Sequence, residues 1–199
     1  LVKDIDMEGI EWTPIEGYAN TVLGNGYAIK NLSAPLFGTT NASFKGLHLE
    51  GVAINETANP NVGAFARAIV ATDTVKPTFE NCSANGTITV NCTEYTLEEG
   101  ADTARSFAIG GFAGYTQGVD FTECTNSINI DVDQVVNSAN NTVIYPSVAG
   151  FVGLLNHHTN ADETKKLSNM WKCENNGSID VYVPSCGSGN QYENKVVCY

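Results

Sequence analysis

The chain has 199 residues, of which 42% are hydrophobic and only 16% are charged, and its formal net charge is −12. This acidity argues against a nucleic-acid-binding protein and against docking to an anionic membrane, because both need a basic face. No apolar run approaches the ~20 residues of a membrane span. Asn (22) and Gly (19) are abundant while Lys and Glu are few, which disfavours a helical bundle and favours an extracellular all-β protein.

An internal repeat contains a Gly-rich apolar motif built around a Phe. Its copies span residues 35–38, 62–66, 109–114 and 148–153, and their aromatic residues are Phe37, Phe65, Phe112 and Phe151. Short apolar segments bounded by Gly and Asn are typical of buried strands joined by tight turns. We therefore expect the four rings to stack as an internal ladder.

A second motif follows each of the last three copies. In it a Cys is followed six residues later by Ile and eight residues later by Val, the period-two alternation of a half-buried strand. The copies occupy 79–90, 121–132 and 171–181, with Ile88, Ile130 and Ile179 at the inner position. These Ile side chains are expected to form a second ladder. Trp171 is expected to fill the buried slot of Phe79 and Phe121.

Such a unit is too short to bury its apolar side alone, whereas stacked copies bury a continuous column. The repeat therefore predicts an all-β fold, a β-solenoid of irregular repeats; an antiparallel sandwich is the alternative, but it leaves the near-identical strand motifs unexplained. Loop insertions would account for the uneven spacing, at residues 67–78, 93–107, 133–147 and 154–170. We expect a repeat domain over 1–183 and a tail over 184–199 that packs on the solenoid or extends it.

The opening residues Asp4-Ile5-Asp6-Met7, the segment Gly24-Asn25-Gly26-Tyr27 and the Phe and Cys motifs, in this order, resemble GLUG-motif repeat proteins. The resemblance covers most of residues 1–183. It implies a right-handed β-helix in a secreted or cell-surface bacterial protein, of a type common in gut Bacteroidetes that includes adhesins, with no shared catalytic machinery. The sequence departs from the family pattern over residues 18–22, and the tail has no counterpart in it.

Six cysteines lie in the last two-thirds of the chain, and no two of them form a Cys-x-x-Cys motif. With only three His, a zinc site is poorly supported, whereas an even count in an extracellular composition favours disulfides. Neighbouring copies in one column would lie about 4.8 Å apart, within reach of a disulfide. We expect the bonds Cys186–Cys198 (stapling the tail), Cys124–Cys173 and Cys82–Cys92. Buried free thiols are the alternative.

Eight Asn-x-Ser/Thr sequons suggest N-glycosylation. They are centred on Asn31, Asn41, Asn55, Asn81, Asn85, Asn91, Asn140 and Asn176. The alternative is that an Asn- and Thr-rich surface generates sequons by composition alone.

The candidate catalytic or metal-binding groups are acidic pairs and one His pair: Asp4/Asp6, Glu98/Glu99, Asp131/Asp133 and His157-His158. A glycoside hydrolase needs two carboxylates at a fixed separation, and residues two apart on a strand share a face. Asp131, however, aligns with Thr89 and Asp180 at the outward polar position of the repeat, so a solvated face is the simpler interpretation. We expect no catalytic site, no metal and no cofactor. A carbohydrate-active hydrolase or lyase on the same scaffold is the alternative.

The chain is expected to be a non-enzymatic structural or adhesion module, extracellular or on the cell surface. As such a module it would be a glycosylated subunit of a head-to-tail filament. The chain starts at Leu1 without an initiator Met or a signal-peptide pattern, which indicates a mature secreted chain or a fragment. The residues at both termini have strand-like sequences without a capping element, so we expect another copy, or neighbouring repeats of a longer chain, to cover the two ends. Surface glycans are further candidate partners, because Trp12 and Trp171 could stack on sugars, although both are expected in the core.

Overall fold

A computed structural model describes residues 1–96, 107–137, 142–143 and 146–182. These residues form strands and turns and no helix, which confirms the all-β class for the described part of the chain. The strands pair in parallel with two exceptions among these residues. β13 (Thr125–Asn137) is antiparallel to β14 (Thr142–Val143), and β17 (His158–Thr159) is antiparallel to β18 (Lys165–Lys166). The expected tail, 184–199, lies outside the described residues.

Three sheets account for most of the strands. Sheet A contains β1 (Ile5–Asp6), β3 (Ala28–Lys30), β6 (His48–Glu56), β9 (Ser83–Tyr95) and β13, with β14, β20 (Glu174–Asn175) and β21 (Ile179–Val181) beside β13. Sheet B contains β4 (Phe37–Thr40), β7 (Ala66–Val70), β11 (Ala113–Gln117) and β16 (Val152–Asn156). Sheet C contains β2 (Val22–Leu23), β5 (Phe44–Lys45), β8 (Thr78–Glu80), β12 (Asp120–Thr122) and β19 (Asn169–Trp171). A smaller pair is β10 (Ala108–Gly110) with β15 (Ser147–Ala149).

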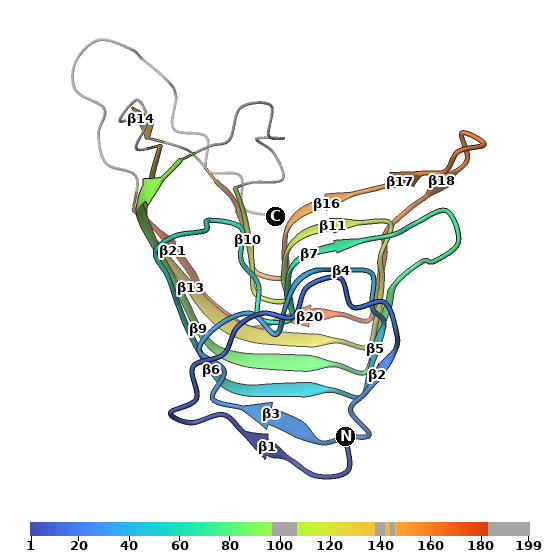
Figure 1. Ribbon diagram of the computed structural model, residues 1–199, viewed down its shortest axis with the longest axis horizontal. Helices are drawn as coiled ribbons and strands as arrows, with labels where there is room; N and C mark the ends of the chain where they lie inside the picture. The colour runs from blue at the N-terminus through green and yellow to red at the C-terminus, as the bar shows by residue number, and fades with distance from the viewer. Residues whose placement is uncertain (97–106, 138–141, 144–145, 183–199) are drawn as a thin grey trace.

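The chain visits the three sheets in a constant order, B then C then A. The strands β4–β5–β6, β7–β8–β9, β11–β12–β13 and β16–β19–β20/β21 each make one such passage, which we call a tier. Each strand pairs in parallel with its counterpart in the next tier, and Figure 1 shows the sheet A strands β3, β6, β9 and β13 stacked one above another. The tiers therefore enclose one interior, bounded by the three sheets.

Period-two alternation fills this interior from sheet A. Ile88 pairs in register with Ile130, and Ile130 with Ile179, so the predicted Ile residues form one column. Ile54 extends the column by one tier, because it pairs with Ile88. The intervening residues point outward and are polar in most tiers, which is the pattern of a sheet with one buried and one solvated face.

Aromatic rings fill the interior from sheets B and C. The rings of Phe65, Phe112 and Phe151 stack at centroid distances of 4.7 and 4.2 Å. A second column contains Phe79 and Phe121, which were expected to share a buried slot, and adds Phe44; the centroid distances along Phe44, Phe79 and Phe121 are 4.6 and 4.9 Å. The columns meet edge to face, as for Phe65 and Phe79 at 5.2 Å and 89°. Such offset and perpendicular contacts are the favoured geometries of aromatic pairs.

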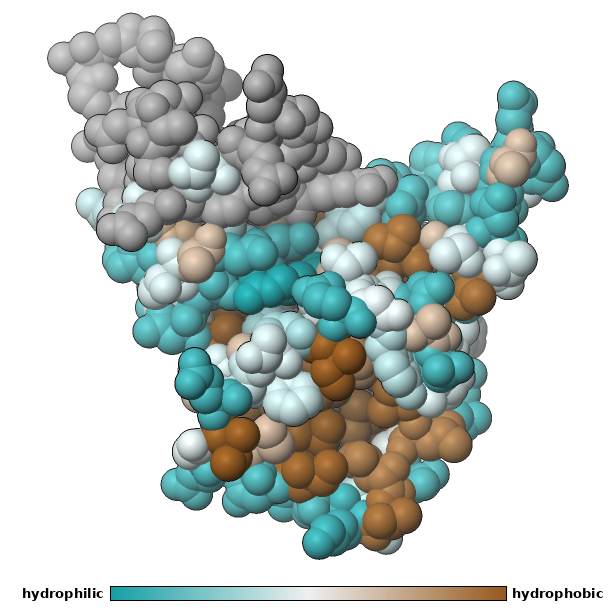
Figure 2. Space-filling model, viewed as in Figure 1, coloured by the Kyte–Doolittle hydropathy of each residue, from teal (hydrophilic) through white to brown (hydrophobic). Residues whose placement is uncertain are grey.

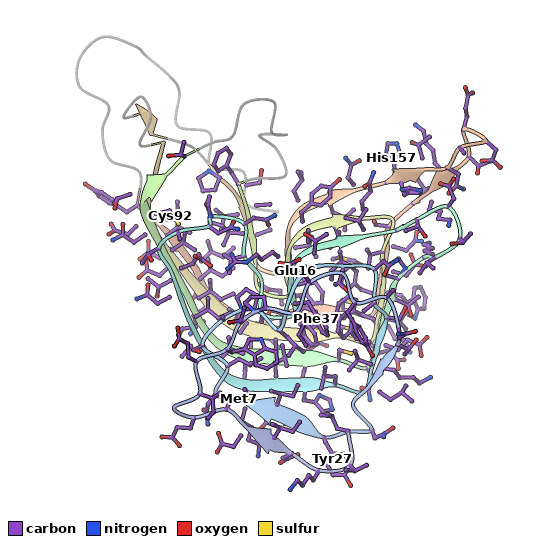
Figure 3. All side chains as sticks on the ribbon, viewed as in Figure 1. Met7, Glu16, Tyr27, Phe37, Cys92 and His157 are labelled. Atoms are coloured by element: carbon purple, nitrogen blue, oxygen red, sulfur yellow. The ribbon has the colours of Figure 1, made fainter. Side chains whose placement is uncertain are left out.

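Phe37 is the exception in the predicted ladder of four rings. Its backbone pairs with Ala66 rather than with Phe65, so it lies one residue out of register with the other three. Its ring is still buried, and it contacts Tyr18 at 5.5 Å and Phe44 at 5.4 Å (Figure 3). The expected ladder is therefore a column of three rings with Phe37 beside it.

The corner between sheets C and A repeats one backbone conformation. Gly46, Asn81, Glu123 and Lys172 all have positive φ there, between 49° and 57°. Gly and Asn adopt this left-handed region readily, whereas Glu and Lys do so at a cost. The recurrence turns the chain at the same point in every tier and aligns the residues that follow, Leu47, Cys82, Cys124 and Cys173.

A nearly buried ion pair joins sheet A to sheet B. Arg67 on β7 contacts Glu56 at the end of β6 at 2.8 Å, with 19% and 10% of their side chains exposed. Glu56 also accepts hydrogen bonds from the backbone N–H groups of Ala58 and Asn59, and Arg67 donates to the Asn61 carbonyl. The pair thus ties sheet A to sheet B across the connection between two tiers.

Candidate functional site

The outer face of sheet C carries the most exposed tryptophan of the described chain. Trp171 has 64% of its surface exposed and lies in register with Thr122, which in turn pairs with Glu80. The prediction that Trp171 fills the slot of Phe79 and Phe121 is wrong, because Met170 is the register partner of Phe121. Trp171 precedes its Cys by two residues whereas the two Phe precede theirs by three, and a shift of one residue moves a side chain to the opposite face.

Polar side chains share this face of sheet C with the indole. Asn169, two residues earlier on the same face, donates from its backbone and side-chain nitrogens to Asp120 Oδ1 at 3.1 and 2.8 Å. Lys76 contacts the other oxygen of Asp120 at 2.7 Å. An exposed aromatic ring beside ordered amide and carboxylate groups is suited to stacking on a sugar while its hydroxyls are hydrogen-bonded. We call Asp120, Thr122, Asn169 and Trp171 the Trp171 face.

Trp12, the other sugar-stacking candidate, is partly buried against the core. Its Nε1 donates to the carbonyls of Pro35 and Leu36 at 3.1 and 3.3 Å. This satisfied indole fastens the 7–16 segment to the tier above it, so Trp12 is placed as a packing residue.

The acidic candidates lie on outer faces. Asp131 pairs in register with Thr89 and Asp180, and all three side chains point away from the interior. Asp133, the candidate partner of Asp131, accepts a hydrogen bond from Asn91 Nδ2 at 2.9 Å. The Glu98/Glu99 pair lies outside the described residues.

Asp4 and Asp6 are held in ion-pair and hydrogen-bond contacts at the edge of sheet A. The backbone N–H of Ala28 and the ammonium of Lys30, 2.8 Å away, lower the pKa of Asp4. The side chain of Asn31 and the backbone N–H of Glu8 lower the pKa of Asp6. A general acid in a hydrolase needs its pKa raised, so these shifts run in the opposite direction.

The His157-His158 pair lies on the projecting β17–β18 arm (Figures 1 and 3). His158 Nε2 contacts Asp73 Oδ1 at 3.1 Å, and Lys166 donates to the carbonyls of Thr72 and Asp73. These contacts fix the arm to the loop that follows β7. Within the described ranges, no three His, Cys, Asp or Glu side chains are grouped so that they could hold a metal ion.

The described cysteines are free thiols at two places in the fold. Cys82, Cys124 and Cys173 precede β9, β13 and β20 at the repeated corner, in one column as predicted from the motif spacing. The expected Cys82–Cys92 bond is wrong, because these residues lie at opposite ends of the extended strand β9. Ten residues of strand span on the order of 30 Å, far beyond the ~7 Å limit of a disulfide.

Cys92, labelled in Figure 3, lies on β9 and not in that column. Its thiol is buried and faces the Glu56 carbonyl at 3.6 Å. Burial, and then the charge of Glu56, raise the pKa of Cys92 to about 12, so this thiol is unreactive near neutral pH. Cys124 and Cys173 also carry free thiols, so the structure shows no bond between them. The expected Cys186–Cys198 bond lies outside the described residues.

The sequons are distributed over the outer faces and corners. Asn31, Asn55, Asn81, Asn85 and Asn176 are exposed, and Asn41 and Asn91 are half-buried. Asn31 and Asn91 use Nδ2, the atom that would carry a glycan, to bind Asp6 and Asp133. Asn140 lies outside the described residues. The exposed sequons without such a bond are the more accessible acceptors.

Apolar side chains are exposed together at the β1 end of the stack. Figure 2 shows hydrophobic atoms gathered at the lower end of the molecule, where Figure 1 draws β1 and β3. The exposed apolar residues of this end are Val2, Ile5, Ile10, Ile15 and Leu23. Strand β1 pairs only with β3 among the described strands, so its second edge is open there. We call this surface the β1 end.

Comparison with family models, with curated proteins and with solved structures found no match to this chain. The described residues also contain no helix long and apolar enough to cross a membrane.

Proposed function

We propose that the chain is a right-handed β-helix that acts as a non-enzymatic structural or adhesion module outside the cell or on its surface. The constant B–C–A order of the tiers, their parallel in-register pairing and the continuous Phe and Ile columns support this fold. The GLUG-motif resemblance supports the same handedness and location. Exposed sequons, such as those at Asn55 and Asn176, support a glycosylated surface.

The apolar β1 end is the observation that carries the assembly role. An open strand edge presents unpaired N–H and C=O groups, and here it lies beside a group of exposed aliphatic side chains. The lateral faces are polar by contrast, as in the outward column Asn55, Thr89 and Asp131. A second copy that adds a strand of its opposite end to β1 would make a heterologous, head-to-tail contact, which propagates as a filament rather than closing.

Particle size tests this proposal. Light scattering and negative-stain imaging of the full chain at micromolar concentration should show particles larger than 21.2 kDa. Ile5→Lys with Leu23→Lys should reduce them to monomers, because two charges would have to be buried in the contact. Thr87→Lys, on the lateral face of sheet A, is the matched control and should leave the size unchanged. A wild type that is monodisperse at the monomer mass would overturn self-assembly and leave neighbouring repeats of a longer chain to cover this end.

The Trp171 face supports surface glycans as the partner in adhesion. Its exposed ring and the Asp120–Asn169 hydrogen bonds offer a stacking surface with fixed polar groups. Binding to a panel of immobilised glycans should be lost in Trp171→Ala and kept in Tyr182→Ala, because Tyr182 is equally exposed but directly follows β21 of sheet A. Equal binding by both variants, or no binding by the wild type, would refute this assignment.

A further inference from the structure

Three thiols stand in one column at the corner between sheets C and A. Ser83, Thr125 and Glu174, each directly after a Cys, are register partners across three tiers. The corner backbones are hydrogen-bonded in the same way, from Thr125 N to Cys82 O at 3.0 Å and from Glu174 N to Cys124 O at 2.9 Å. The column Cys82, Cys124 and Cys173 is therefore set by the sheet pairing itself.

The identical corner conformation also aligns the side chains. Each Cys follows a residue with φ near 50°, so the three Cα–Cβ bonds leave the backbone in the same direction. Parallel neighbours are about 4.8 Å apart, within the ~4.4–6.8 Å between the Cα atoms of a disulfide. Each of the three thiols donates to the backbone carbonyl two residues before it, that of Glu80, Thr122 or Trp171, at 3.4, 3.3 and 3.5 Å, so the side chains have the same orientation in every tier.

The two inner thiols differ from the outer one in burial. Cys82 and Cys124 are buried, at 1% and 0% exposed, whereas Cys173 is half-buried in the β19–β20 tier. The side-chain interaction between the inner thiols lowers the pKa of Cys82 and raises that of Cys124, and burial raises the pKa of Cys173. Reagents would thus reach Cys173 first, while the inner pair contains the better nucleophile.

We propose that this column is a cross-linking site that holds one disulfide, Cys82–Cys124, formed by exchange with a small disulfide of the glutathione class that enters at Cys173. The Cys173 thiolate attacks the small disulfide, forming a mixed disulfide and releasing one small thiol. Cys124 then attacks Cys173 Sγ while its proton passes to the departing small thiolate, which releases the second small thiol and leaves a Cys124–Cys173 bond. Finally the Cys82 thiolate attacks Cys124 Sγ and expels Cys173 as a thiolate, which takes up a proton.

The balance is two protein thiols oxidised and one small disulfide reduced to two thiols, with protons passing from the attacking to the departing sulfurs. Displacement at sulfur needs the attacking and leaving sulfurs in line with the central one, and the stacking of the three cysteines in successive tiers favours this arrangement. The inner bond is favoured over Cys124–Cys173 because the surrounding tiers shield it from reductants. In the cell the reaction needs the oxidising surroundings of the proposed function, but purified protein tests it independently of assembly or glycan binding.

Disulfide mapping of the full chain after exposure to oxidised glutathione tests the proposal. No Lys, Arg, acidic or aromatic residue separates Cys82 from Cys92 in the sequence, so the mapping is done in Cys92→Ser, where the two cannot be confused. Cleavage with trypsin and a Glu-specific protease should yield a non-reduced Cys82–Cys124 peptide pair, about 2 Da lighter than the two separate thiol peptides. Cys173 should be recovered as an alkylated thiol.

Two variants test the order of the steps. In Cys82→Ser the bond should stop at Cys124–Cys173. In Cys173→Ser the Cys82–Cys124 bond should form about tenfold more slowly, because the accessible entry thiol is gone. The proposal is overturned if Cys82 and Cys124 stay reduced, if wild-type Cys124 ends bonded to Cys173, or if either inner Cys bonds outside the column. An unchanged rate in Cys173→Ser would refute entry through Cys173.

Discussion

Removal of one ring from the aromatic interior should have a large and position-dependent effect on stability. Phe121 is 1% exposed, and its ring lies 4.9 Å from Phe79, 5.4 Å from Phe151 and 6.5 Å from Phe112 between centroids. Phe121→Ala removes these contacts and leaves a cavity that the cross-packed columns cannot fill. Fully buried Phe→Ala changes cost about 3–5 kcal/mol. At about 2–4 °C per kcal/mol for a chain of this size, the midpoint should fall by about 6–20 °C.

The neighbouring tier supplies the matched control. Met170 is the register partner of Phe121 in the same column, but 44% of it is exposed, because the tier of β19 has no described tier on its other side. Met170→Ala should therefore cost less than about 1 kcal/mol, against the 2–5 kcal/mol typical of a buried Met. Thermal and urea unfolding followed by circular dichroism measure both variants. Equal midpoints for the two variants would refute the enclosed aromatic interior.

Three further outcomes follow from single contacts. Arg67→Met strands the Glu56 carboxylate and should lower the free energy of unfolding in urea by about 3–5 kcal/mol, most of which Arg67→Met with Glu56→Leu should recover; no recovery would contradict the ion-pair account. Glu123→Gly should raise the free energy of unfolding by about 0.5–1 kcal/mol, because the φ of 54° at Glu123 suits glycine better and the exposed ion pair with Lys172 contributes little. A loss of stability in this variant would count against the corner geometry. The pKa of Asp4 is lower in the folded state than in the unfolded state, where it is ~3.9. The contribution of Asp4 to stability is therefore complete above the unfolded pKa and is lost as the pH falls through the folded pKa. The backbone N–H of Ala28 donates to Asp4, so its protection against hydrogen exchange, corrected for intrinsic rates, should drop in acid. Constant protection would show that this hydrogen bond is unimportant.

The sequence was most informative where period-two alternation coincided with a fixed Cys spacing. The Ile88, Ile130 and Ile179 positions follow from that spacing alone, because strand pairing preserves it from tier to tier. Trp171 was misplaced because we aligned it as an aromatic residue rather than by its distance from Cys173. Counting from the Cys would have put Met170 inside and Trp171 outside, so the signal was present.

Other features had no local signal. The expected loop insertions at 93–107 and 133–147 begin as continuations of β9 and β13, which extend to Tyr95 and Asn137. This extended strand is what separates Cys82 from Cys92. The Glu56–Arg67 pair depends on how sheets A and B meet, and neither residue lies in a motif that could have linked it to the other.

The most direct test of the stacked, in-register fold is a methyl–methyl NOE experiment on protein labelled at Ile δ1 positions. Ile54, Ile88, Ile130 and Ile179 occupy successive tiers of one column, with neighbouring backbones about 4.8 Å apart. The account predicts cross-peaks between Ile54 and Ile88, between Ile88 and Ile130, and between Ile130 and Ile179, with none between Ile54 and Ile179. Absence of the Ile88–Ile130 cross-peak, or a direct one between Ile54 and Ile179, would contradict the parallel stack.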